Sequence, residues 1–216
     1  MLEAIGIEKS FGKVKVLKGI DLSIRQGEVV AIIGASGAGK STLLHILGTL
    51  DLPDKGLVKI NNENVFERGS DALANFRNRN IGFVFQFHNL LPEFSAIENV
   101  IIPGLLLGEK EKEVKIKAMK LFDTLGITDR ANHKPSEMSG GEQQRTAVAR
   151  ALINSPNLVL ADEPSGNLDS VNATELHKLI FQLRETLGQS FVIVTHNMDF
   201  ATMADRTITI HDGRIV

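Results

Sequence analysis

A glycine-rich loop offers the clearest chemistry in the sequence. Residues 34–42 read Gly-Ala-Ser-Gly-Ala-Gly-Lys-Ser-Thr and follow the apolar run Val29–Ile33. Glycines let successive backbone N–H groups turn toward a polyphosphate, a lysine can reach its β and γ phosphates, and a serine hydroxyl can bind the accompanying Mg²⁺. The loop therefore predicts a nucleoside triphosphate site with Mg²⁺, built from Gly34, Ser36, Gly37, Gly39, Lys40, Ser41 and Thr42.

Two carboxylates follow a second apolar run. Residues 157–163 read Asn-Leu-Val-Leu-Ala-Asp-Glu, so Asp162 and Glu163 stand at the end of a predicted strand. Mg²⁺ prefers oxygen ligands, which suits Asp162 to hold the ion directly or through water. Glu163 is then placed to orient or polarise an attacking water. An acidic turn would explain the same pair if it stood alone, but beside a phosphate loop the metal and water roles are favoured.

Two further strand ends carry polar side chains. Gln86 follows the run Ile81–Phe85, and His196 follows residues 192–195. Side chains at the carboxyl ends of parallel strands gather at one edge of the sheet, so both are predicted to lie near the γ-phosphate. A lone histidine after a strand is more often a surface residue. The other polar strand ends favour the phosphate role here.

A second anion-binding turn is predicted at residues 138–145, Met-Ser-Gly-Gly-Glu-Gln-Gln-Arg. Ser139 and Glu142 have the spacing of a capping box, ahead of a helix expected over Thr146–Ile153. Gly140 and Gly141 expose successive N–H groups at the positive end of that helix, where phosphate can bind. One triphosphate cannot easily use two separate anion turns of one chain, so a second copy is implied. The alternative is a turn that only caps a helix.

The elements that must position these groups form an α/β pattern. Apolar runs typical of strands lie at residues 2–7, 29–33, 81–85, 158–161, 191–195 and 207–210. Helical spacing separates several of them, as in the stripe Leu176, Leu179, Ile180, Leu183 and Leu187. The pattern predicts a parallel sheet covered by helices. Residues 87–156 show no strand signal and carry the helical stripe Val114, Ala118, Leu121, Phe122 and Leu125, so they are predicted to form an inserted helical subdomain.

Composition narrows the possible partners. The 216 residues include 24 Lys plus Arg against 26 Asp plus Glu, with no long basic run, so nucleic acid is not expected as a principal partner. The absence of cysteine excludes disulfides and thiolate metal sites. The apolar stretch at residues 100–108 is too short to span a bilayer and contains Pro103 and Gly104. Any role at a membrane is therefore expected to come through a partner.

In their order and spacing, the phosphate loop, Gln86, the turn at Ser139, the carboxylates at 158–163 and His196 resemble the motifs of the ABC ATPases. The resemblance covers nearly the whole chain. It implies an α/β fold with a P-loop NTPase core, formed by residues 1–86 and 157–216. This core would hold a mainly parallel sheet and an antiparallel β subdomain. Residues 87–156 would be the inserted α-helical subdomain.

The same resemblance implies roles for individual residues in binding and hydrolysing ATP. The catalytic groups would be Glu163, His196, Gln86 and Lys40, and the Mg²⁺ ligands would be Ser41, Gln86 and Asp162. Phe11 would stack on adenine, at a position where the family more often has tyrosine. Alternatively, Phe11 would be a core residue. Two copies would pack head to tail, with ATP between the phosphate loop of one and the signature turn of the other, formed by Ser139, Gly140, Gly141 and Glu142. Asp169 would link the two sites.

Finer features are similar to one branch of the family. Glu142 stands where many members carry glutamine, and residues 161–169 read Ala-Asp-Glu-Pro-Ser-Gly-Asn-Leu-Asp. That branch contains lipoprotein-releasing, macrolide-export and cell-division ATPases, and residues 86–100 most resemble the lipoprotein-releasing members. The resemblance implies a peripheral ATPase on the cytoplasmic side of a bacterial inner membrane, working with separate transmembrane permease subunits. An export or cell-division complex is the alternative.

Partners are predicted from the segment after Gln86 and from the spacing of the motifs. The resemblance predicts that the permease subunits meet the segment after Gln86, through Leu90, Leu91, Phe94 and Ile97; packing inside the helical subdomain is the alternative. A soluble ABC protein of DNA repair is disfavoured, because only 53 positions separate Gln86 from Ser139 and leave no room for a long coiled-coil insertion. The soluble translation type usually joins two cassettes in one chain, and only one set of motifs is present here.

Overall fold

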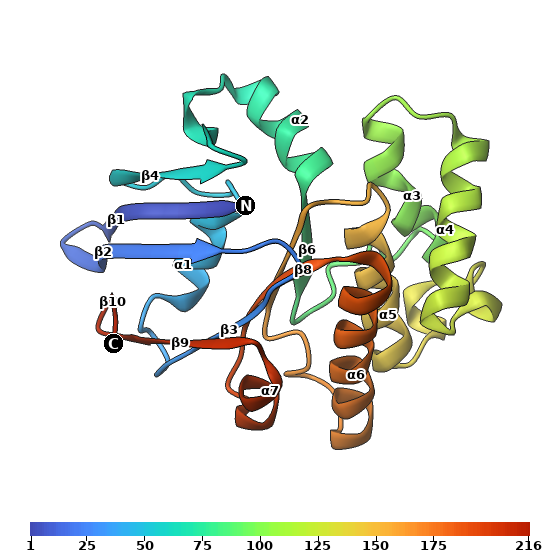
Figure 1. Ribbon diagram of the computed structural model, residues 1–216. Coiled ribbons are helices and arrows are strands. Elements are labelled where there is room, and N and C mark those ends of the chain that lie inside the picture. Colours follow the sequence, from blue (N-terminus) through green and yellow to red (C-terminus); the bar gives the residue numbers. More distant parts are fainter.

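A computed structural model describes residues 1–216 and places the strands in two sheets, with helices around them (Figure 1). The strands are β1 (Leu2–Phe11), β2 (Val14–Ile24), β3 (Val29–Ile33), β4 (Lys55–Ile60), β5 (Glu63–Asn64), β6 (Ile81–Phe85), β7 (Leu158–Asp162), β8 (Ser190–Val194), β9 (Arg206–His211) and β10 (Arg214–Ile215). The α-helices are α1 (Lys40–Leu47), α2 (Ser70–Asn80), α3 (Ala96–Leu106), α4 (Glu111–Leu125), α5 (Gly140–Leu152), α6 (Ser170–Leu187) and α7 (Met198–Met203). Short 3₁₀ helices are η1 (Val65–Glu67), η2 (Thr128–Arg130) and η3 (Pro135–Glu137).

The larger sheet has six strands in the order β10-β9-β3-β8-β7-β6, and all neighbours are parallel except β10 and β9. Its central strands are buried on both faces, which explains their continuous apolar sequences. The predicted runs at residues 29–33, 81–85, 158–161, 191–195 and 207–210 fall in this sheet, apart from Thr195, which follows the end of β8. The α/β class with a mainly parallel sheet is confirmed.

The smaller sheet is antiparallel, in the order β2-β1-β4-β5. The run at residues 2–7 belongs to this sheet, and β1 continues to Phe11. No apolar run predicted β2 or β4. Their charged residues alternate with buried ones, because this sheet buries only one face, so no continuous apolar run marks them. The expected antiparallel β subdomain is nevertheless present.

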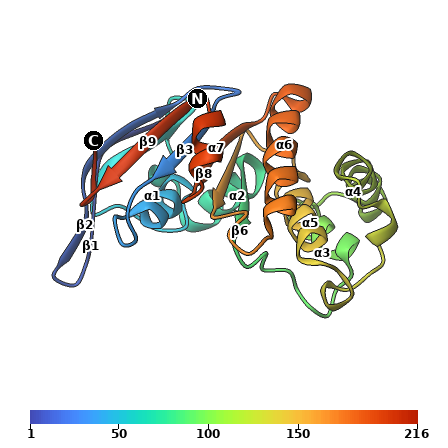
Figure 2. The same cartoon turned by 90° about the horizontal axis from the view of Figure 1, so that it is seen from below.

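Two hydrophobic cores lie on opposite faces of the six-stranded sheet, and β3 contributes to both in alternation. Val30 and Ile32 face the core shared with α1 and the antiparallel sheet. Val29 and Ala31 face the core shared with the helices α3 to α7. This alternation is the two-residue period of a strand. The phosphate-loop helix α1 is thus packed between the two sheets (Figure 2).

The helices α3, α4 and α5 gather at one end of the molecule, on the side away from the antiparallel sheet (Figures 1 and 2). Of the predicted α4 stripe, all members but one are fully buried, and Leu121 packs at the edge of the core. α5 begins at Gly140, well before the predicted start at Thr146. The first turn was not predicted because its two glycines are poor helix formers. The capping box compensates for their low helix propensity.

One member of the α6 stripe was assigned wrongly. Leu187 is 53% exposed, because it is the last helical residue before the left-handed Gly188. The other four stripe residues are buried as predicted.

None of the helices has both the length and the apolar character that crossing a bilayer requires. The subdomain limits 1–86, 87–156 and 157–216 stay predictions, and one hydrophobic core runs from α4 across to the sheet.

Phe122 provides a test of the helical core. It is 0% exposed, so Phe122→Ala is expected to lower the free energy of unfolding by about 3–5 kcal/mol through lost burial and a residual cavity. Urea unfolding followed by circular dichroism would measure the change. The same substitution at Phe87, which is 74% exposed, is the control and should shift stability by no more than about 0.5 kcal/mol. Equal losses in both variants would contradict this core.

Candidate functional site

The phosphate loop requires glycine at named positions. Gly34, Gly37 and Gly39 have φ angles of 150°, 77° and 103°, which side chains disfavour. A Cβ on Gly34 would also lie 2.1 Å from the carbonyl oxygen of Ile210, and one on Gly39 would lie 2.8 Å from Leu17 Cδ2. The loop ends at α1, whose first turn holds no acidic residue and no side-chain cap. Its free N–H groups therefore present a positive helix end to an anion.

Lys40 lies at the centre of this loop. It is only 6% exposed, and its ammonium donates to the carbonyl oxygens of Gly34 at 2.9 Å and Ala35 at 3.0 Å. These bonds hold the ammonium within the turn that the glycines form. A fixed positive charge and free N–H groups are thus combined in one loop, as triphosphate binding requires.

Two side-chain oxygens that could bind a metal ion lie together beside the loop. The Ser41 hydroxyl donates to Asp162 Oδ1 at 3.2 Å, which joins the first turn of α1 to the end of β7. A hydroxyl and a carboxylate are hard oxygen ligands of the kind that Mg²⁺ binds. The residues present therefore fit this ion.

Glu163 is held in an unusual backbone conformation. Its φ is +47°, and its N–H donates to the carbonyl of Val194 at 2.9 Å, so it is tied to β8 as β7 ends. His196 Nε2 lies 3.2 Å from Glu163 Oε1, and the His196 N–H donates to Oε2 at 3.2 Å. Burial raises the pKa of the Glu163 carboxyl above its usual value, and the neighbouring His196 opposes part of that rise.

These groups line one cavity of about 350 Å³. Its wall consists of Phe11, Val16, Ser36, Gly37, Gly39, Lys40, Ser41, Thr42, Asp162, Glu163, Val194 and His196. Phe11 is 54% exposed, so its alternative place in the core is excluded. The structure thus brings together the phosphate loop, both carboxylates and the histidine from the ends of three strands, β3, β7 and β8.

Gln86 does not line this cavity. Its side-chain amide donates to Asn167 Oδ1 at 3.2 Å, and the Asn167 amide donates back to the Gln86 carbonyl at 3.0 Å. This reciprocal pair uses the Gln86 nitrogen and leaves its side-chain oxygen free as an acceptor. Asn167 was not among the predicted site residues, since an asparagine in a loop carries no distinctive signal.

The signature turn is also outside the cavity. Ser139 and Glu142 form the predicted capping box at the start of α5. A Cβ on Gly141 would lie 2.8 Å from Asn172 Oδ1, so glycine permits close approach to α6. Within one chain the turn and the phosphate loop therefore do not share a site.

Asp169 has a local structural task. It is the N-cap of α6 and accepts from the Asn172 backbone N–H at 2.9 Å and from the Asn172 side chain at 2.7 Å. These bonds lower the pKa of its carboxyl.

Sequence reasoning also missed His177, whose Nε2 lies 3.2 Å from Ser165 Oγ and whose ring packs against Phe200. Its place in α6 gave no signal apart from a polar residue among apolar ones.

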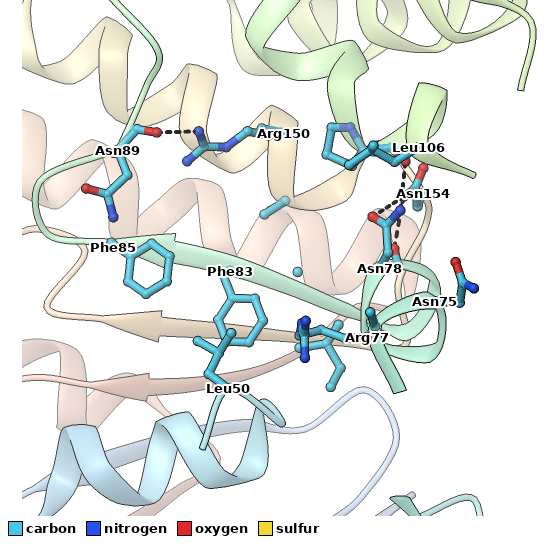
Figure 3. A pocket seen from close by; sticks show the side chains of 15 residues that line it. Leu50, Asn75, Arg77, Asn78, Phe83, Phe85, Asn89, Leu106, Arg150 and Asn154 are labelled. Carbon is cyan, nitrogen blue, oxygen red and sulfur yellow. Dashed lines mark hydrogen bonds between the residues drawn. The ribbon is translucent and has the colours of Figure 1, made fainter. Parts of the chain in front are cut away.

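A separate groove of about 610 Å³ lies where α2, β6, α3 and α5 meet (Figure 3). Its apolar lining includes Phe83, Phe85 and Leu106, and it contains two arginines and no carboxylate. Arg150 donates to the carbonyl oxygens of His88 and Asn89, both at 2.6 Å, and so fixes the segment that follows Gln86.

The residues predicted to meet a permease do not line this groove. None of Leu90, Leu91, Phe94 and Ile97 is among its lining residues, and only Asn89 represents that segment there. Ile97 instead packs against the helical core. The groove depends on how β6, α2 and α5 pack together, which residues 86–100 alone could not reveal.

Comparison with known sequences gives consistent matches. A family model described as ABC transporter matches residues 17–166. The chain is 58% identical over 216 residues to the lipoprotein-releasing system ATP-binding protein LolD of Bacteroides fragilis, with 100% of both chains covered. It is 57% identical over 216 residues to the protein of that name from Cytophaga hutchinsonii, covering 100% of this chain and 99% of the relative.

Solved structures agree with these matches. A dimeric bacterial ABC transporter cassette superposes with a TM-score of 0.91 at 38% identity, covering 100% of this chain and 96% of that one. A dimeric post-hydrolysis state of an ATP-binding cassette, bound to ADP and phosphate, gives a TM-score of 0.90 with the same identity and coverage. The fold similarity therefore extends over the whole chain.

Glu163→Gln provides a pH-dependent test of this geometry. The native pKa of Glu163 lies above its usual value, so the ionised carboxylate destabilises the native state at high pH, and this cost disappears where the group is protonated in both states. We expect Glu163→Gln to raise the Tm at about pH 8 and the difference to shrink toward about pH 4. Thermal unfolding at both pH values measures it. Glu185→Gln, at an exposed position of α6, is the matched control. A difference that grows toward acid pH would contradict the burial of Glu163.

Proposed function

Because the chain belongs to the ABC transporter family, we propose that it is the ATP-hydrolysing subunit of a membrane complex that releases lipoproteins from a bacterial inner membrane. The observation that carries this proposal is the 58% identity, over the full length of both chains, to a lipoprotein-releasing system ATP-binding protein. The cavity with Lys40, Asp162, Glu163 and His196 supplies the chemistry. The subunit would sit on the cytoplasmic face of the membrane.

Binding of ATP would follow from the phosphate loop. The free N–H groups at the start of α1 and the Lys40 ammonium receive the β and γ phosphates. Phe11, exposed at the cavity wall, offers a flat face to the adenine ring. Ser41 and Asp162 would hold Mg²⁺, with the free Gln86 oxygen as a further ligand. When bound, this ion neutralises phosphate charge.

Hydrolysis would use Glu163 as the base. The Glu163 carboxylate takes a proton from water as the water oxygen forms a bond to the γ-phosphorus and the bond from that phosphorus to the β–γ bridging oxygen breaks, leaving ADP and phosphate. A raised pKa makes this carboxylate a better proton acceptor than an exposed glutamate. His196, 3.2 Å from the carboxylate, orients it and faces the departing phosphate. Lys40 stabilises the developing charge on the phosphoryl oxygens.

A second copy would complete the site. The signature turn, Ser139 to Glu142, does not line the cavity of its own chain. We place it against the γ-phosphate held by another copy, in a head-to-tail dimer with two equivalent sites. Both structural relatives described above are dimers. ATP binding would then close the dimer, and product release would open it.

The base assignment gives a direct kinetic test. Glu163→Gln is expected to lower ATP turnover by at least about a hundredfold, because an amide cannot accept the proton, while ATP binding persists. Phosphate release and equilibrium nucleotide binding would be measured on the same preparation. Glu185→Gln, the exposed control on α6, should hydrolyse ATP normally. Turnover close to that of the unchanged chain would refute Glu163 as the base.

The groove at β6 is the proposed docking site of the permease subunits. Its exposed apolar lining includes Leu50, at 46% exposure, and Leu106, at 72%. Arg77 and Arg150 give it a positive character with no lining carboxylate. A short helix of a membrane-spanning subunit, with an apolar face and an acidic residue or its carboxyl end toward the arginines, fits this surface.

Leu106→Glu is expected to prevent docking, since it places a carboxylate in the apolar part of the groove. Tagged Glu163→Gln protein with ATP would be purified from gently solubilised source membranes, with and without Leu106→Glu. The first should recover membrane-spanning permease subunits and lipoproteins, and the second should lose them. Leu187→Glu, at an exposed leucine of α6 outside the groove, is the control.

The proteins recovered decide between the candidate functions. A drug-export or cell-division permease would keep the ATPase mechanism and replace the cargo. Ribosomal or DNA-repair proteins would overturn the transporter proposal. Equal recovery by the Leu106→Glu variant would remove the groove from the docking site while leaving lipoprotein release in place.

A further inference from the structure

The signature turn carries a permanent negative charge. Glu142 Oε2 accepts from the Ser139 backbone N–H at 2.8 Å and from its hydroxyl at 2.9 Å. Hydrogen bonds from Arg130 and Ser139 lower the pKa of Glu142 to about 2. The capping box is therefore ionised at any physiological pH, so protonation cannot remove this charge.

Such a charge conflicts with the task of the turn. A helix N-terminus attracts anions with the equivalent of about half a positive charge, and one full carboxylate in the first turn more than cancels it. In the proposed dimer this turn faces a triphosphate, which is itself strongly negative. An uncompensated Glu142 would therefore weaken the contact between the two copies.

One cation compensates the negative charge of Glu142. Arg130 Nε donates to Glu142 Oε1 at 2.7 Å, and no other residue forms an ion pair with this carboxylate. Arg145, the first basic residue of α5, does not pair with Glu142 but donates to the carbonyl of Leu125 at 3.0 Å. The charge balance of the signature turn thus depends on a residue outside α5.

Arg130 is held in place for this contact. It ends η2, where its backbone N–H donates to the carbonyl of Ile127 at 2.9 Å and its own carbonyl accepts from His133 at 2.9 Å. Ile127 is buried in the helical core, which anchors this turn. The guanidinium is partly exposed, with 41% of the side chain accessible, so its charge also acts on the surface beside the turn.

We propose that Arg130 is a positioning residue that holds and neutralises Glu142, so that the signature turn can accept the triphosphate bound to a second copy. This inference rests on the head-to-tail dimer of the proposed function. Its consequence is that the requirement for Arg130 exists only while residue 142 is a carboxylate. With glutamine at that position the amide is neutral, and no counter-charge is needed.

ATP-driven dimerisation tests the proposal directly. In full-length Glu163→Gln protein, sedimentation would measure the ATP concentration at which half the chain is dimeric. Arg130→Ala is expected to raise that concentration about tenfold, and more at low salt, because salt screens the exposed charge. Adding Glu142→Gln to Arg130→Ala should restore the concentration to within about twofold. Arg79→Ala, at an exposed position of α2, removes the same net charge and is the control.

Each outcome separates this inference from the function on which it rests. If the Glu163→Gln protein itself fails to dimerise with ATP, the dimer and the role of Arg130 fall together. If it dimerises and Arg130→Ala matches it, the role of Arg130 alone is refuted. A loss that Glu142→Gln does not rescue, or that does not change with salt, would mean that Arg130 only supports the fold of the turn, and would also overturn the proposal.

Discussion

The main groups of the site are positioned by the parallel pairing of β3, β8 and β7. In register, Ile32 pairs with Val194 and Val194 pairs with Asp162. Two hydrogen bonds continue the pairing past the strand ends, from Glu163 to Val194 and from Thr195 to Ile32. Because all three strands run the same way, the groups that follow them arrive at one edge. This pairing is enough to bring the phosphate loop, the carboxylates and His196 together.

This convergence has a cost in stability. Glu163 combines a positive φ with a partly buried carboxylate of raised pKa, and both features are unfavourable in an isolated turn. They persist because β7 and the bond to Val194 fix the backbone on both sides. In the phosphate loop, glycines at 34 and 39 replace side chains that would collide with β9 and β2. The site is thus made from conformations that only the surrounding sheet can maintain.

The cavity and the groove share a boundary formed by two paired strands. Phe85, which lines the groove, pairs in register with Asp162, which lines the cavity. Directly beyond them, the Gln86–Asn167 pair joins the segment leading to the groove with the loop that follows Glu163. A displacement of β6 by a docked partner would therefore reach the carboxylates within one strand spacing. The groove and the cavity are thus connected through adjacent strands rather than through the whole molecule.

Features whose signals are local could be predicted from the sequence alone. The glycine loop, the strand ends at Gln86, Asp162 and His196, and the capping box at Ser139 each depend on neighbours within a few residues, so composition and spacing were enough. The packed fold is needed to see which distant residues pair, as Asn167 does with Gln86 and Arg130 with Glu142, and which residues line the groove. The alternating β2 and β4 also became recognisable only beside β1. Such contacts arise from the packing of whole elements, which no short stretch of sequence encodes.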